Sequence, residues 1–244
     1  MVRDGIRPQK LIAPCGRIAC MKHHPWRIVA AAVLALNLTL VLAAPPAPRV
    51  RVTTSMGDIV IELNPERAPL TVANFLRYVR EGHYTNTIFH RVVGNFVIQG
   101  GGHAAGDMQL KPTHDPIPNE SGNGLQNKRG AVGEARSESP HSGNAQFYID
   151  ISDNPDLDPV PARWGYTVFG KVVEGMDVVD RIGAVPTGSV GAFKSDAPLK
   201  PIVIQKIEEI NASTATHSPP SAPATTPPPA APAATPAAPV PPPH

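Results

Sequence analysis

The stretch that most constrains the fold is residues 89–102, which read Phe-His-Arg-Val-Val-Gly-Asn-Phe-Val-Ile-Gln-Gly-Gly-Gly. Two apolar, β-branched runs flank the Gly94-Asn95 dipeptide, a combination typical of two strands joined by a tight turn. Because side chains alternate along a strand, Arg91 and Gln99 are expected on one face, with Phe96 beside them. The segment therefore predicts a hairpin that gathers these three side chains. The alternative is a buried hairpin with one surface arginine.

Further elements follow from the same kind of pattern. Apolar residues recur at helical spacing after Pro69, a favoured first residue of a helix, and Gly82 follows the last of them. The predicted elements are strands at 50–54, 58–63, 88–93, 96–99, 130–135, 146–150, 166–173 and 201–209, a helix at 69–81, and a shorter helix bounded by Gly175 and Gly183. About eight strands and two helices indicate a mainly β fold, a closed antiparallel barrel capped by the helices. The pattern alone does not separate this barrel from a sandwich.

The N-terminal part of the chain has the composition of an export signal. A basic segment at 21–27 precedes an apolar run at 28–44 that ends in small residues, about the length of a signal-peptide core. Residues 1–44 are therefore interpreted as an extension and signal peptide, with Met21 as the expected true start and cleavage expected after Ala43. The alternative is an uncleaved anchor. An exported protein is expected, in the periplasm or in the medium, without stable membrane contact once the signal is cleaved.

The remaining chain divides into three zones. Residues 45–49 form a Pro-rich linker, and residues 50–211 form the predicted globular domain. The segment 212–244 consists mainly of Pro, Ala, Ser and Thr and lacks Lys, Arg, Asp and Glu, so it is expected to be disordered. A spacer that tethers the domain or docks in an aromatic groove is the alternative.

Charge and cysteine content exclude several classes of function. The formal charge of +2 depends on the first 44 residues; the rest has 16 basic against 19 acidic side chains, a net charge of −3. That balance argues against nucleic acid or an anionic membrane as a partner. Both cysteines, Cys15 and Cys20, precede Met21, so the mature protein has no disulfide.

The other polar residues indicate no metal or nucleophile site. The histidines lack metal-ligand spacing, and the serine at Ser139-Pro140-His141-Ser142 lacks a nucleophile elbow. His90 alternates away from Arg91 and is interpreted as orienting a loop or strand. The acidic residues of 150–158 are interpreted as a solvated loop, and the glycines at 100–102 as close backbone turning. No cofactor is therefore expected, and a metal- or nucleotide-dependent hydrolase has no supporting constellation.

The segment 89–102 closely resembles the strand pair of cyclophilins, the peptidyl-prolyl cis–trans isomerases, and the similarity extends over about 160 residues. It continues through Asn119-Glu120, residues 123–136 and 144–149, Leu157-Asp158 and residues 166–172, in the manner of the bacterial branch. The resemblance implies a cyclophilin-like barrel that isomerises X–Pro bonds in exported proteins, as a monomer and without a cofactor. Proline-containing polypeptide segments are the implied partners.

The resemblance also implies the site. Arg91 would stabilise the twisted amide, Phe96 would line the proline cup, and Gln99 would hydrogen-bond the substrate backbone while orienting Arg91. The implied substrate-binding residues are Val97, Ala135, Arg136, Gln146, Tyr148, Leu157 and Tyr166. Gln146 would clamp the backbone, and Tyr148 would form one wall of the cup.

Three positions depart from the family pattern. Glu134 stands where an apolar residue is usual, and Tyr148 stands where Phe is commoner, so that its hydroxyl is expected to narrow or polarise the cup. Asp156 replaces the tryptophan of cyclosporin-sensitive relatives, so weak cyclosporin binding is expected. Glu134 and Tyr148 leave one alternative function, a non-catalytic module that binds proline segments as a chaperone or scaffold.

Overall fold

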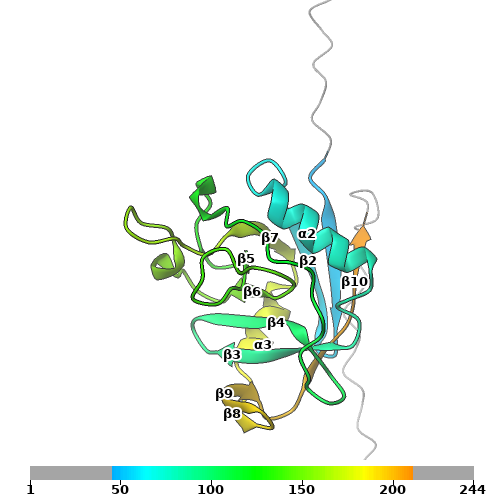
Figure 1. The fold of residues 1–244 in the computed structure, drawn as a ribbon. Helices are drawn as coiled ribbons and strands as arrows, with labels where there is room; N and C mark the ends of the chain where they lie inside the picture. Colours follow the sequence, from blue (N-terminus) through cyan, green and yellow to red (C-terminus); the bar gives the residue numbers. More distant parts are fainter. Residues whose placement is uncertain (1–45, 211–244) are drawn as a thin grey trace, which may run out of the picture. The chain divides into compact units, whose positions relative to one another are not determined.

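The computed structural model describes residues 46–210, and these form a closed β-barrel (Figure 1). Its strands are antiparallel and close in the order β1-β10-β3-β4-β6-β5-β7-β2. Their bounds are β1 Arg49–Thr54, β2 Gly57–Leu63, β3 Thr87–Val93, β4 Val97–Ala104, β5 Ala131–Glu134, β6 Phe147–Asp150, β7 Val168–Glu174 and β10 Ile202–Ile210. The predicted barrel is confirmed, and the sandwich is excluded. The predictions for 1–44 and 212–244 lie outside the described residues.

The barrel closes through its first strand. Arg49 lies opposite Glu62 of β2 on one side and opposite Ile210 of β10 on the other. Residue 49 thus already belongs to β1, one residue before the predicted start of the domain. Because every barrel strand has two neighbours, the sheet has no open edge.

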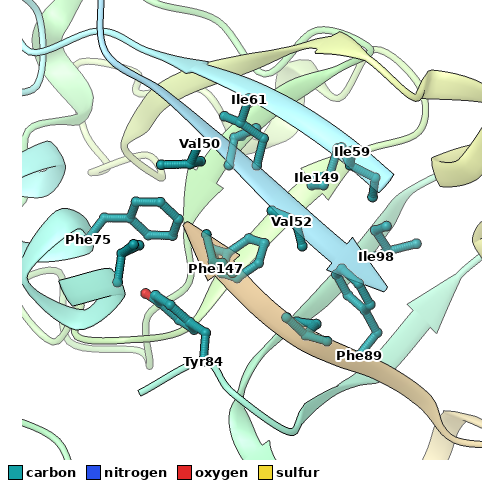
Figure 2. Close-up of a cluster of buried hydrophobic side chains, with 14 of the residues drawn as sticks. Val50, Val52, Ile59, Ile61, Phe75, Tyr84, Phe89, Ile98, Phe147 and Ile149 are labelled. Atoms are coloured by element: carbon teal, nitrogen blue, oxygen red, sulfur yellow. The ribbon is translucent and has the colours of Figure 1, made fainter. Parts of the chain in front are cut away.

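The barrel interior is filled by every second side chain of its strands. Phe147 and Ile149 of β6 point inward with the apolar residues of β1 and β2 (Figure 2). Tyr148, which lies between them in the sequence, belongs to a separate cluster. The Phe147 ring lies edge-on to Phe75 and to Tyr84, with centroids 5.7 Å away in each case. Burying an aromatic or aliphatic side chain of this size contributes about 1.5–3 kcal/mol, so this interior dominates the stability.

Two helices pack against the barrel. Helix α2 (Pro69–Arg80) places Phe75 among the interior rings, and α3 (Met176–Gly183) buries Ile182 completely. Two short 3-10 helices, η1 (Ser121–Asn123) and η2 (Pro155–Leu157), lie in the long loops. Both predicted α-helices are confirmed. None of the helices among residues 46–210 has the length and apolar character needed to cross a membrane.

The glycine run in β4 serves close packing within a strand. β4 continues to Ala104, five residues past its predicted end at Gln99. A Cβ added to Gly101, which has φ of +86°, would lie 2.9 Å from the Tyr84 ring and 3.0 Å from the Phe147 ring. The expectation that these glycines turn the chain was wrong. They let large interior side chains lie directly against the strand.

A two-stranded ribbon stands outside the barrel and was not predicted. It consists of β8 (Thr187–Val190) and β9 (Phe193–Pro198) and packs beside β3 (Figure 1). Its sequence is rich in Gly, Ser and Pro and lacks a regular apolar alternation, so the usual strand signal is missing.

Candidate active site

An open pocket of about 330 Å³ lies on the outer surface of the barrel. Nine of the ten predicted site residues line it: Arg91, Phe96, Val97, Gln99, Ala135, Arg136, Tyr148, Leu157 and Tyr166. The tenth, Gln146, is not among the lining residues and contacts the site through Gln99. Residues up to 75 positions apart in the sequence therefore meet at one surface.

Strand register places the central residues in a row. Arg91 lies opposite Gln99 in the β3–β4 pair, and Gln99 lies opposite Tyr148 in the β4–β6 pair. Directly opposed residues project to the same face of a sheet, so the three side chains project together to the outer face. Gly133 of β5 completes the row, and its missing side chain leaves room for the Tyr148 ring. The predicted placement of Arg91 and Gln99 on one face is confirmed.

Arg91 keeps its hydrogen-bond donors free. Its side chain is 39% exposed, and its Nε atom lies 3.8 Å from Oδ2 of Asp196. Its guanidinium carbon lies 5.9 Å from the centre of the Phe96 ring. Among residues 46–210, no protein acceptor takes a hydrogen bond from this guanidinium. A guanidinium carries five N–H donors, so Arg91 can donate to a bound ligand.

Phe96 follows a tight turn that is held by the chain after β6. Asn95 adopts a positive φ of 59°, and the Phe96 amide donates to the Val93 carbonyl at 3.1 Å. The Phe96 carbonyl accepts two hydrogen bonds, from the Ile151 amide at 2.8 Å and from Asn154 Nδ2 at 3.1 Å. The ring at the edge of the pocket is therefore fixed through its backbone.

The Gln99 side chain is hydrogen-bonded to Gln146 and not to Arg91. Its Nε2 atom donates to Oε1 of Gln146 at 3.2 Å. The Gln146 carbonyl in turn accepts from the Ala135 amide at 3.0 Å. Among the described residues, no hydrogen bond joins Gln99 to Arg91, so the expectation that Gln99 orients Arg91 has no such bond behind it. The Gln99–Gln146 pair instead links three implied site residues, Gln99, Gln146 and Ala135.

The Tyr148 hydroxyl is engaged away from the pocket. It donates to Oδ1 of Asn127 at 2.5 Å, and burial raises the tyrosine pKa well above its ordinary value. Asn127 then donates through its amide and its side chain to Oδ1 of Asp158, at 2.8 Å each. The hydroxyl was expected to narrow or polarise the cup. The polarising effect is wrong, because the hydroxyl hydrogen-bonds Asn127 and so helps to fix the loop next to Leu157. The narrowing stays a prediction.

Arg136 differs from Arg91 in that its guanidinium is bound to the protein. Its guanidinium carbon lies 4.3 Å from the centre of the Tyr166 ring. Nε and the two terminal nitrogens donate to backbone carbonyls of two neighbouring loops, at 2.8–3.4 Å: Ser137, Glu138, Trp164 and Gly165. Arg136 therefore joins two loops at the rim of the pocket.

Two carboxyl groups are buried near the site. Glu134 is 4% exposed, and burial, followed by the charge of Glu120, raises its pKa to about 8. Asp150 is fully buried, and its pKa is raised to about 7, mainly by burial. Within the described residues, Oε1 of Glu134 and Oδ2 of Asp150 have no hydrogen-bond partner. The interpretation of 150–158 as a solvated acidic loop is therefore wrong for Asp150.

His90 packs away from the pocket. It is 8% exposed, its ring stacks on Phe193 with centroids 5.6 Å apart, and burial lowers its pKa to about 4. The ring is therefore neutral at physiological pH. No group of three His, Cys, Asp or Glu residues suited to a metal ion occurs between residues 46 and 210.

Three supporting residues were not found by sequence reasoning: Asn127, Asn154 and Asp196. Asn127 and Asn154 act through side-chain hydrogen bonds to loops, and Asp196 lies on the unpredicted ribbon. None belongs to a strand or helix pattern that could have indicated it. The site can hold a small apolar ring against its apolar lining, which includes Phe96 and Tyr166, and the guanidinium of Arg91 is free to donate at the pocket.

Comparison with known proteins places this pocket in a family. The family described as cyclophilin type peptidyl-prolyl cis-trans isomerase/CLD matches residues 49–209. A peptidyl-prolyl cis-trans isomerase of Streptomyces antibioticus is 53% identical over 159 residues, covering 64% of this chain and 95% of the relative. Isomerase A of Dickeya dadantii is 46% identical over 187 residues, covering 75% and 97%. Isomerase B of Escherichia coli is 50% identical over 157 residues, covering 63% and 94%.

A solved structure agrees with these relatives. The crystal structure of a Cryptosporidium parvum cyclophilin type isomerase, determined in the presence of the dipeptide Ala-Pro, aligns with a TM-score of 0.58 at 29% identity. The alignment covers 67% of this chain and 99% of that chain.

Proposed function

We propose a mechanism and a cellular role for an enzyme whose family is established: the chain belongs to the cyclophilin-type peptidyl-prolyl cis–trans isomerases. It catalyses rotation about X–Pro bonds, which takes roughly 10–100 s without a catalyst. The barrier of ~18–20 kcal/mol comes from loss of amide resonance. No covalent bond is broken and no proton must be transferred, so the site needs to hold the proline and stabilise the twisted amide.

Arg91 is the proposed electrostatic catalyst. As resonance is lost, the lone pair of the proline nitrogen is no longer shared with the carbonyl group and can accept a hydrogen bond, so a permanently charged donor near this nitrogen favours the twisted state. The observation that supports this role is the free guanidinium at the pocket edge, since the pocket's other arginine, Arg136, is bound to backbone carbonyls. Arg91 can therefore donate to substrate without first losing a protein hydrogen bond.

The other pocket residues are proposed to bind the peptide around proline. The apolar side chains of the pocket would hold the ring: Phe96, Val97, Tyr148, Leu157 and Tyr166. Gln99, oriented by Gln146, would bond the substrate backbone beside Ala135, and Arg136 would shape the rim. A relative crystallised in the presence of Ala-Pro supports proline-containing segments as the ligand. The non-catalytic binding module loses its support, because relatives at 53%, 50% and 46% identity are named as peptidyl-prolyl cis-trans isomerases.

The test is Arg91→Ala assayed on a short Ala-Pro-Phe reporter. Removing a single electrostatic donor costs about 10²–10³ in rate in other enzymes, and we expect a loss of kcat/KM in that range. Arg80→Ala is the matched control, because Arg80 is an exposed arginine on α2 paired with Glu209. The control should keep wild-type activity. Equal rates in wild type and Arg91→Ala would refute the role of Arg91.

We further infer that the enzyme is exported and accelerates folding of exported proteins. The support is the basic segment and apolar run of residues 21–44. Fractionation of cells expressing the full chain, with N-terminal sequencing of the product, tests the location. Recovery of uncleaved protein in the cytosol would contradict export, whereas uncleaved protein in the membrane fraction would indicate the anchor.

Cyclosporin is expected to bind weakly, since Asp156 occupies the position of a family tryptophan and lies beside Leu157 at the pocket. A nanomolar complex in calorimetry would contradict this expectation.

A further inference from the structure

We propose that Asp196 is a positioning residue for Arg91, held at the pocket edge by the β8–β9 ribbon. The proposal rests on the proposed catalytic role of Arg91. It adds a carboxylate from outside the barrel to a site whose other groups come from the barrel strands and the loops that join them.

The first observation is the ion pair itself. Oδ2 of Asp196 lies 3.8 Å from Nε of Arg91, and the two side chains are 41% and 39% exposed. This is the only acidic side chain within ion-pair distance of Arg91 among residues 46–210. The carboxylate faces the Nε side of the guanidinium, which leaves the terminal nitrogens available to a substrate.

The second observation is the backbone at Asp196. Gly188 lies opposite Ala197 and Val190 lies opposite Phe193, so the single residue between them on β8 faces three residues on β9. Within this bulge Asp196 adopts a φ of +60°, a conformation uncommon for residues other than glycine. Bulges re-aim side chains, and unusual backbone conformations persist where the surrounding structure imposes them. Here the bulge directs a carboxylate at Arg91.

The third observation is how the ribbon is attached to β3. The Phe193 ring stacks on His90 at 5.6 Å and lies edge-on to His103 at 4.9 Å. His90 directly precedes Arg91, so two consecutive residues of β3 contact the same ribbon. Burial of His90 keeps its ring neutral, so this attachment does not depend on charge.

These contacts restrict the motion of a long, flexible side chain. An arginine side chain has many rotamers, and the guanidinium carbon of Arg91 lies 5.9 Å from the centre of the Phe96 ring, its aromatic neighbour in the pocket. The ion pair with Asp196 reduces the number of rotamers open to the Arg91 side chain before the substrate binds. A competing role, in which the carboxylate occupies donors that the substrate needs, predicts the opposite sign for its removal.

The experiment compares Asp196→Asn with wild type on an uncharged Ala-Pro reporter at low and high salt. We expect kcat/KM to fall about twofold to fivefold at low salt, the range available to an exposed ion pair. The difference should shrink as salt screens the pair in wild type. Glu209→Gln is the matched control, because it removes a comparably exposed ion pair, with Arg80, and should leave activity unchanged.

Both substitutions are then combined with Arg91→Ala. If Asp196 acts through Arg91, Asp196→Asn has no further effect in that background. Because turnover in the Arg91→Ala background is low, the effect of Asp196→Asn there is also measured as peptide affinity, by NMR titration. An equal loss in both backgrounds, a loss that salt does not change, or unchanged or faster turnover in the single variant would overturn the proposal. Failure of the proposed function appears separately, as full activity in Arg91→Ala alone.

Discussion

The inward and outward faces of β4, β5 and β6 are made by the same strands but differ in chemistry. The inward residues Ile98, Val132, Phe147 and Ile149 are apolar and 0–1% exposed. The outward residues include Val97, Gln99, Ala135 and Tyr148, which line a pocket. Because adjacent residues alternate between the faces, a one-residue register shift would exchange core and site. The register that fills the barrel therefore also assembles the pocket.

Each face contains one buried carboxyl group, and the two are supported differently. Glu134 lies opposite Phe147 and so shares the inward face, and no hydrogen bond to Oε1 compensates its burial among the described residues. Asp150 lies opposite Val97 on the outward face, and its Oδ1 accepts from Asn154 Nδ2 at 2.6 Å. The comparison indicates that Asp150, although its Oδ2 also has no partner among the described residues, is tied by its Oδ1 to the hydrogen bonds of the pocket loops, whereas the burial of Oε1 of Glu134 is uncompensated.

The largest expected effect concerns the inward face. Phe147→Ala removes a ring that contacts Phe75, Tyr84 and Phe89, and should lower the free energy of unfolding by about 3–5 kcal/mol in a denaturant titration. The folded fraction should retain nearly full kcat/KM, because Tyr148 and Gln99 keep their register. Tyr148→Phe, on the opposite face of the same strand, is the control and should cost about 1 kcal/mol. A larger stability loss in Tyr148→Phe than in Phe147→Ala would contradict the claim that the inward face contributes most of the stability.

The next effect comes from Glu134 and depends on pH. Burial raises its pKa from 4.5 to about 8, so between these values the unfolded chain releases a proton that the folded protein retains. The free energy of unfolding of the wild type, compared with that of Glu134→Gln, is therefore highest below pH 4.5 and falls as the pH rises. It reaches its lowest relative value above pH 8. We expect the variant to match wild type in acid and to be more stable by a few kcal/mol at pH 8–9.

Urea midpoints of both proteins across this pH range give the measurement. Glu62→Gln serves as the control with the opposite sign, because the pKa of Glu62 is lowered by hydrogen bonds from Arg49 and Lys171. That carboxylate stabilises the fold above its unfolded pKa, so its removal should reduce stability at neutral pH. A difference between wild type and Glu134→Gln that does not vary with pH would show that folding leaves the pKa of Glu134 unchanged, and would contradict the prediction.

The smallest effect tests the network of the outward face. Asn154→Ala removes donors to the Phe96 carbonyl and to Asp150, and should cost about 1–2 kcal/mol of stability. Because it frees Phe96 at the pocket, we expect KM to rise severalfold with kcat less affected. Asn123→Ala also loses two side-chain bonds, one donated to the Val168 carbonyl and one accepted from the Leu125 amide, away from the pocket, and should lower stability without changing KM. Equal KM values in the two variants would mean that Asn154 is only structural.

The strands, the helices and most of the pocket could be predicted because they follow from local patterns. Alternation fixed the faces of Arg91 and Gln99, and Pro69 and Gly175 marked where the helices begin. The resemblance to cyclophilins then brought distant residues such as Leu157 and Tyr166 to the same pocket, which no periodicity could have done.

What could not be predicted depends on side chains that bond across loops. The position of Asp150 at the end of β6 made it resemble the solvated acids after it, although strand pairing buries it. The direction of the Tyr148 hydroxyl depends on its hydrogen bond to Asn127, a loop residue whose proximity the sequence does not indicate. Asp196 lies in a bulge of a ribbon whose sequence has no alternation, so its meeting with Arg91 had no local signal.

The pairing of Arg49 with Ile210 bears on whether the strands must follow one another in this order along the chain. The first and last strands of the barrel are neighbours, so a short peptide could join them without crossing the pocket. New ends could then be opened in an exposed turn, such as the one at Gly106, where even an added side chain would meet nothing within 4 Å. The barrel thus qualifies for circular permutation, in which the same three-dimensional neighbours would be kept by a chain that begins and ends elsewhere.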